Sequence, residues 1–119
     1  MVETSFNTTL ESVTVTATSG GANGNILYTV PANNDVTIDY LGVSNSTSTA
    51  QKITIEVLHA GDSTYYQIAK SHTVAANTTF QLIDGNKLHL HAGDKIVCSK
   101  DAGTLDVTLS AKIFFNPNR

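Results

Sequence analysis

The chain has 119 residues, a formal net charge of −3 and only 14% charged residues. Apolar residues make up 40% of it, which is enough to bury the core of one small domain. The 7 lysine and arginine residues are scattered and have no aromatic residues interleaved with them, so nucleic acid is not an expected partner. No apolar run approaches the roughly 20 residues that a transmembrane helix needs, so no membrane contact is expected.

Polarity comes mainly from uncharged side chains, with 17 Thr, 10 Ser and 10 Asn. Threonine alternates with valine, isoleucine and leucine, which favours strands, while asparagine, glycine and aspartate favour the turns between them. The single cysteine, Cys98, cannot form an intrachain disulfide, and residues 1–13 lack the features of a signal peptide. The composition therefore predicts an all-β protein made in a reducing cytoplasm.

The first 24 residues differ from the rest of the chain. Residues 1–24 are expected to form an extended N-terminal arm with a flexible linker, followed by a β-sandwich domain at 25–119. The linker is placed at 19–25 because this stretch is rich in glycine, serine and asparagine.

Four apolar residues of the arm are candidate contact residues. Phe6 and Leu10 stand alone in a polar stretch and suit docking on a neighbour. Val13 and Val15 alternate with polar residues, so this piece is either an edge strand or an arm that becomes ordered only against a partner.

From residue 25 onward, short alternating segments follow one another with turn residues between them. The hydrophobic pattern changes parity near Gly42, which predicts a bulge or bend, and Asp84-Gly85-Asn86 is predicted to be a turn. The last segment has the clearest alternation, from Leu105 to Phe115, and is predicted to be a central strand. The expected strands lie at 25–30, 35–45, 52–58, 64–69, 72–74, 78–83, 87–91, 95–99 and 104–115.

This succession of strands, with short turns and no helical period, predicts an antiparallel β-sandwich of jelly-roll type. Two short motifs recur within it. His-Ala-Gly-Asp occurs at 59–62 and 91–94, and Thr-Val-x-Ala-Asn at 29–33 and 73–77. Glycine can adopt positive φ, and the following aspartate can bond to the local backbone. We therefore interpret His-Ala-Gly-Asp as a corner of the chain rather than as a metal or catalytic motif.

His89 and His91 form a His-x-His pair, a spacing that holds a metal in some β-barrel enzymes. On a strand both side chains point to the same face, opposite Leu88 and Leu90, so they are expected on the solvent face. No histidine follows His91 to complete a cupin-like site. Exposed surface residues are the preferred interpretation. The alternatives are a cluster around an oligomer axis and a cupin-like metal protein.

No catalytic residue, cofactor site or metal site is predicted, and the chain is not expected to be an enzyme. Serine and threonine are abundant, but no nucleophile–base signature surrounds them or Cys98. Tyr65 and Tyr66 should face opposite sides of a strand, one in the core and one on the surface. A surface tyrosine at this doublet is the basis of a glycan-binding alternative.

The segments "YTVPANNDVTIDYLGVSNSTSTAQKITIEVLHAGDSTYYQIAK" and "VAANTTFQLIDGNKLHLHAGDKIVCSKDAGTLDVTLSAKI" resemble small β-sandwich virion proteins of tailed bacteriophages. The resemblance covers residues 28 to 113 and consists of a T-V-P-A-N corner, a "GDSTYY" hairpin, "L-x-L-x-AGD-x-I" and a final "G-x-L-D-V-x-L-S" strand.

The resemblance implies a structural virion protein assembled in the cytoplasm of a bacterial host. The first expectation is a capsid decoration or cement protein; the alternative is a collar, tail or fibre subunit. The implied partners are the major capsid protein or other virion subunits. A homo-oligomer is also expected, with a trimer as the specific prediction. Phe114 lies opposite the core face of the last strand, so it is expected either under the other sheet or in an interface, and it is a further candidate interface residue.

Overall fold

A computed structural model describes residues 6–15, 19–100 and 105–115, and within these ranges all side chains except those of 6–13 and 85–87. The described residues form strands and one short 3-10 turn. No helical segment among these residues is long and apolar enough to cross a membrane. The elements are β1 (Phe6–Val15), η1 (Gly21–Asn23), β2 (Asn25–Thr29), β3 (Asn34–Asn45), β4 (Gln51–Leu58), β5 (Tyr65–Val74), β6 (Thr78–Leu90), β7 (Lys95–Lys100) and β8 (Leu105–Phe115).

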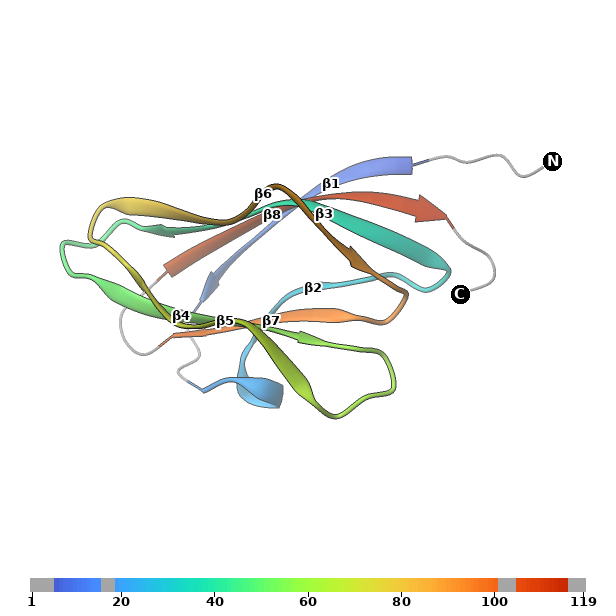
Figure 1. Cartoon of the computed structure of the whole chain (residues 1–119), viewed down its shortest axis with the longest axis horizontal. Coiled ribbons are helices and arrows are strands. Elements are labelled where there is room, and N and C mark those ends of the chain that lie inside the picture. Colours follow the sequence, from blue (N-terminus) through green and yellow to red (C-terminus); the bar gives the residue numbers. More distant parts are fainter. Residues whose placement is uncertain (1–5, 16–18, 101–104, 116–119) are drawn as a thin grey trace.

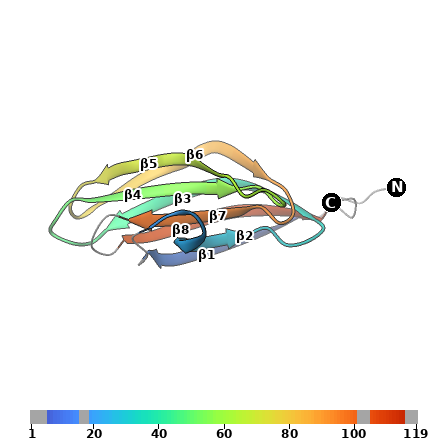
Figure 2. The ribbon, with the colours of Figure 1, turned by 90° about the horizontal axis from the view of Figure 1, so that it is seen from below.

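The strands form two four-stranded antiparallel sheets that pack face to face (Figure 1). Sheet A has the order β1-β8-β3-β6, and sheet B has the order β2-β7-β4-β5. Figure 2 shows the strands of both layers running along the long axis of the molecule. The prediction of an all-β antiparallel sandwich is confirmed.

The strand pairing has the pattern of one long hairpin folded over on itself. β4 pairs with β5 at the tip, β3 with β6, β2 with β7, and β1 with β8, all antiparallel. This paired ribbon passes back and forth between sheets A and B, which produces the eight-stranded jelly-roll arrangement. The jelly-roll prediction is therefore also confirmed.

The core lies between the sheets and follows the alternation seen in the sequence. Leu105, Val107, Leu109 and Ala111 of β8 are all fully buried, and β8 lies between β1 and β3 as the prediction of a central strand requires. Phe115 was expected to continue this buried row, but it is 62% exposed. It pairs with the first residue of β3, so it lies at the end of the sheet, where little of the opposite layer covers it.

The change of parity in β3 occurs slightly earlier than predicted. The register shifts between Ile38 and Tyr40, and again between Leu41 and Gly42 on the β6 side. Simple alternation predicts that Val36, Ile38 and Tyr40 share one face, but the first shift moves Tyr40 to the outer face. A Cβ atom at Gly42 would overlap the Tyr40 ring, so only glycine lets that ring lie across the strand.

The predicted turn at 84–86 is wrong, because β6 continues through it. Asp84 pairs with Tyr40 and Leu88 pairs with Ile38, so three residues of β6 bulge opposite a single residue of β3. The predicted strands at 64–69 and 72–74 are likewise one strand, β5, which is interrupted by register shifts near Ser71. Continuous pairing with one neighbour outweighs the local preference for a turn in both cases.

Residues 6–15 are an edge strand paired with β8 along their whole length, which is the first of the two expectations for this piece. The glycine-rich stretch that follows contains η1, which lies on the outer face of sheet B. The Gly21 N–H donates a hydrogen bond of 2.9 Å to Oε1 of Glu56, a buried carboxylate on β4. The division of the chain at residue 24 remains a prediction.

Replacing Leu109 with alanine should destabilise the fold strongly, because its fully buried side chain would leave a cavity between the sheets. We expect the free energy of unfolding, measured by urea denaturation, to fall by about 2–5 kcal/mol. Thr108→Ala, on the outer face of the same strand, is the matched control and should change it by roughly 0.5 kcal/mol or less. Equal effects of the two substitutions would contradict the assignment of the core face.

Candidate functional site

The two His-Ala-Gly-Asp segments adopt the same turn. In each, the aspartate N–H donates a hydrogen bond of 3.0 Å to the histidine carbonyl three residues earlier. The glycine has positive φ in both copies, 77° at Gly61 and 85° at Gly93, as expected for the third residue of a type II turn. Both segments are corners of the chain, as predicted.

The Thr-Val-x-Ala-Asn segments are a second repeated corner. Asn33 and Asn77 have φ of 60° and 56°, a left-handed conformation that asparagine tolerates better than most residues. The valine of each copy, Val30 or Val74, is almost completely buried. Each corner is followed at once by a strand, β3 in one case and β6 in the other.

The sequence does not show that the two His-Ala-Gly-Asp corners touch. The end of β4 pairs with the start of β7, which brings the corners side by side. Asp94 is buried between them: its Oδ1 accepts the Ala60 N–H over 2.8 Å, and its Oδ2 accepts the His91 N–H over 2.9 Å. The His59 Nδ1 atom lies 3.5 Å from the same Oδ2. Asp94 therefore holds the two corners together.

Asp62, the equivalent aspartate of the first corner, is exposed and has a different role. The backbone N–H groups of Thr64 and Ser63 donate to it and keep the pKa of its carboxyl below the ordinary value, with smaller contributions from His59 and the Tyr66 hydroxyl. The same four-residue motif thus has two roles. At 91–94 its aspartate is buried and links two loops, whereas at 59–62 its aspartate stabilises a solvent-exposed turn.

A second buried polar side chain lies at the opposite end of the sandwich. The Asn45 amide nitrogen donates to the carbonyls of Thr49 and Val74 over 2.9 and 3.0 Å. Its oxygen accepts the N–H and the hydroxyl of Thr47 over 3.0 and 2.6 Å. All the hydrogen-bonding capacity of this amide is used to hold the loop after β3 and to tie it to the end of β5.

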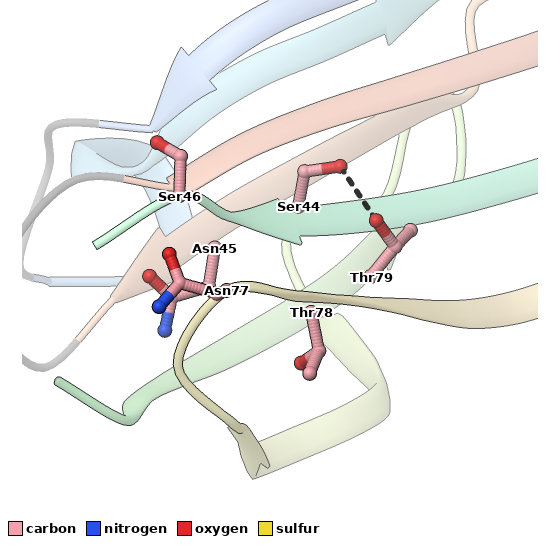
Figure 3. A pocket seen from close by; sticks show the side chains of 6 residues that line it. All are labelled: Ser44, Asn45, Ser46, Asn77, Thr78 and Thr79. Atoms are coloured by element: carbon pink, nitrogen blue, oxygen red, sulfur yellow. Dashed lines mark hydrogen bonds between the residues drawn. The ribbon is translucent and has the colours of Figure 1, made fainter. Parts of the chain in front are cut away.

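An open pocket of about 300 Å³ lies beside Asn45 (Figure 3). The Ser44 and Thr79 hydroxyls lie 3.2 Å apart on neighbouring strands, and the Asn77 N–H donates to the Thr47 carbonyl over 3.1 Å. A lining of hydroxyls and amides can hydrogen-bond a neutral polar ligand, but it contains no base to activate a nucleophile. The lining residues are Ser44, Asn45, Ser46, Asn77, Thr78 and Thr79.

His89 and His91 are exposed on the outer face of sheet A. The His89 Nδ1 atom is 3.0 Å from the Thr37 hydroxyl, and the His91 Nδ1 atom is 3.1 Å from Asp35 Oδ1. Across the described parts of the chain, no three His, Cys, Asp or Glu side chains lie together as metal ligands would. Each imidazole is thus positioned by a neighbour on β3 and not by a shared ligand.

The tyrosine doublet presents one exposed ring. Tyr66 is 49% exposed, and its ring lies 5.7 Å from the His59 ring, tilted by 54°. Tyr65 is half-buried beside Gly21, where η1 lies on sheet B. The expectation that one tyrosine enters the core is wrong, because β5 is an edge strand and η1 provides the cover for Tyr65.

The predicted contact residues occupy different environments. Phe6, Leu10 and Val13 belong to β1, but their side chains lie outside the described part of the structure. Val15 is fully buried in the core of its own sandwich, and Phe114 is half-buried on the outer face of sheet A, paired with β3. A role of these residues in contacts between subunits remains a prediction.

Cys98 is fully buried on the core face of β7. Burial raises the pKa of its thiol to about 12, so the thiol stays protonated at neutral pH and is a poor nucleophile.

Removing the Asp94 carboxylate should separate the two corners. Asp94→Ala leaves the Ala60 and His91 N–H groups without their acceptor, and we expect it to lower the free energy of unfolding by about 1–3 kcal/mol in urea denaturation. Asp62→Ala, at the same position of the other corner, is the matched control and should have a clearly smaller effect. If Asp62→Ala lowered the free energy of unfolding as much as Asp94→Ala, Asp94 would not have the special linking role assigned to it.

No protein-family model and no curated protein matches the sequence. Among solved structures, the chain resembles one from "Structure of infectious bursal disease virus Gx strain", with a TM-score of 0.56 and 13% identity. This match covers 97% of the present chain and 33% of the virus chain, so the chain spans about a third of that protein. A chain from "Bacillus endospore appendages form a novel family of disulfide-linked pili" has a TM-score of 0.52 and 13% identity, with 97% and 91% of the two chains covered. At such identities these likenesses show a shared fold.

Proposed function

We propose that this protein is a structural subunit of a virus particle, and specifically a capsid decoration or cement protein of a tailed bacteriophage. It would bind the major capsid protein or other virion subunits, stabilise the head lattice and assemble in the bacterial host cytoplasm. The proposal assigns it no catalytic role and no cofactor. A homotrimer is the proposed oligomeric state on the particle.

The observation that carries the proposal is the jelly-roll strand order over nearly the whole described chain. Double-sheet jelly rolls recur in viral capsid domains. The most buried polar side chains, Asp94 and Asn45, hold loops of this scaffold together, and the pocket beside Asn45 is lined by hydroxyls and amides. These two side chains are thus used in building the fold.

The structural likenesses support a role in an assembly. One neighbour comes from the structure of a virus, and the other from appendages that form disulfide-linked pili. Cys98 is buried with a raised pKa, so it is poorly suited to forming a disulfide between subunits. Contacts between copies of this chain would therefore be non-covalent. The resemblance of residues 28 to 113 to small virion proteins of tailed bacteriophages supports this type of virus.

Copy number in purified particles tests the proposal. Quantitative mass spectrometry against labelled peptide standards should find the protein in a fixed, high ratio to the major capsid protein. A host cytoplasmic protein that is abundant in the lysate serves as the control for carry-over. A small fixed number of copies would favour the collar, tail or fibre alternative over decoration. Absence from the particles would overturn the virion proposal.

A glycan-binding fibre subunit is the second candidate, because Tyr66 presents an exposed ring next to other polar groups. The ring lies beside His59, and Asp62 interacts with the Tyr66 hydroxyl. A flat aromatic face with a carboxylate and an imidazole beside it can stack on a sugar ring and hydrogen-bond its hydroxyls.

A glycan array distinguishes the glycan-binding fibre subunit from the capsid decoration protein. If it is correct, the wild-type protein binds at least one glycan and Tyr66→Ala loses most of that binding. Tyr65→Ala is the matched control, because Tyr65 is half-buried beside η1, and it should retain the binding. An array without signal, or full binding by Tyr66→Ala, would remove the candidate.

A further inference from the structure

The outer face of sheet A carries mainly negative charge among its described side chains. Asp35, Asp84 and Asp106 lie there, each beside a buried residue of the core face. Lys112 is the described lysine on this face, paired across the strands with Thr37. The other described side chains on the face include His89, His91, which lies 3.1 Å from Asp35, and many hydroxyls: Thr37, Tyr40, Ser44, Thr79, Thr108 and Ser110.

The outer face of sheet B carries the opposite charge. Lys52 lies between buried residues of β4, and Lys95 pairs with Leu58, one position beyond the core pair Val57–Ile96. Lys70 follows Ala69, which packs on the core, so alternation directs all three lysines outward. Glu56 belongs to the same face, but η1 covers it: it is 7% exposed and accepts the Gly21 N–H. The accessible charges described on this face are therefore lysines.

The two charged faces lie on opposite sides of the sandwich (Figure 1). A contact of sheet A with sheet A across a two-fold axis would bring the aspartates of two copies together, and a contact of sheet B with sheet B would bring lysines together. Like charges facing each other across an interface are unfavourable. A contact of sheet A with sheet B joins opposite charges. Removing water from the neutral hydroxyls around these charges costs less free energy than removing it from charged groups.

We infer that a second copy of this chain docks with the Lys52, Lys70 and Lys95 face of its sheet B on the Asp35, Asp84 and Asp106 face of sheet A. Such an interface is heterologous, so each docked copy still presents one face of each sign. Because the faces are opposite, this contact extends a row of copies on the particle and is separate from the contact that would close a trimer. The inference rests on the proposed role as a multi-copy subunit and names a contact between its copies.

Charge reversal with mutual rescue tests this contact. One variant carries Lys52→Glu, Lys70→Glu and Lys95→Glu; the other carries Asp35→Lys, Asp84→Lys and Asp106→Lys. The wild-type protein should self-associate in analytical ultracentrifugation at low salt and dissociate at ~0.5 M salt, where the screening length is only a few ångströms. Each variant alone should associate about 100-fold more weakly or worse, because it carries the same sign of charge on both faces.

An equimolar mixture of the two variants should recover association, because the unchanged face of each one matches the unchanged face of the other. Asp62→Lys reverses a charge in the exposed turn between β4 and β5, away from both faces, and should associate like the wild type. Circular dichroism melting confirms that each variant is folded, and a variant that fails is replaced by its three single substitutions.

Three outcomes would overturn the inference: a monomeric wild-type protein at low salt, reversal variants that associate as well as the wild type, or folded variants whose mixture stays monomeric. These outcomes are independent of the copy number in particles. A protein abundant in particles but monomeric in solution would keep the proposed function and remove this contact. A protein that associates by charge but is absent from particles would keep the contact and remove the proposed function.

Discussion

A jelly roll must carry a hydrogen-bonded ribbon from one sheet to the other, and at each crossing backbone groups leave the regular ladders. At one end of the sandwich the crossing is closed by Val30, whose N–H donates to the Asp94 carbonyl and whose carbonyl accepts the Gly93 N–H, both over 2.9 Å. At the other end the Asn77 N–H donates to the Thr47 carbonyl over 3.1 Å. Because unpaired buried backbone groups are costly, the whole architecture depends on these links.

Two buried polar side chains provide hydrogen-bond partners for backbone groups that lie outside the strand ladders. Asp94 accepts two N–H groups from separate corners, and Asn45 bonds Thr47 and Thr49 of the loop after β3 and the carbonyl of Val74 at the end of β5. Each side chain makes ordinary short hydrogen bonds, and these bonds join segments that are distant in the sequence. With these groups committed to the scaffold, the exposed sheet faces and edges remain for contact with other molecules.

The sequence predicted those parts of the fold that depend on neighbouring residues. Alternation in β8 identified its core face, and glycine followed by aspartate identified the corners at 59–62 and 91–94. The errors occur where pairing with a distant strand outweighs a local preference. Asp84-Gly85-Asn86 has turn chemistry, yet it continues β6, because β6 pairs with β3 on both sides of it and takes up the extra residues as a bulge. Tyr40 leaves the core face for the same reason.

The sequence by itself determined that the chain forms strands, which residues face inward on most of them, and that it turns at 59–62 and 91–94, because each depends on alternation and on turn residues a few positions apart. Only the tertiary structure decided the order of the strands and the different roles of Asp62 and Asp94. It also decided that, among the described side chains, three aspartates and one lysine lie on the outer face of sheet A and three lysines on that of sheet B. These features arise because β4 meets β7 and β3 meets β8, pairings between residues distant in the sequence that no local pattern encodes.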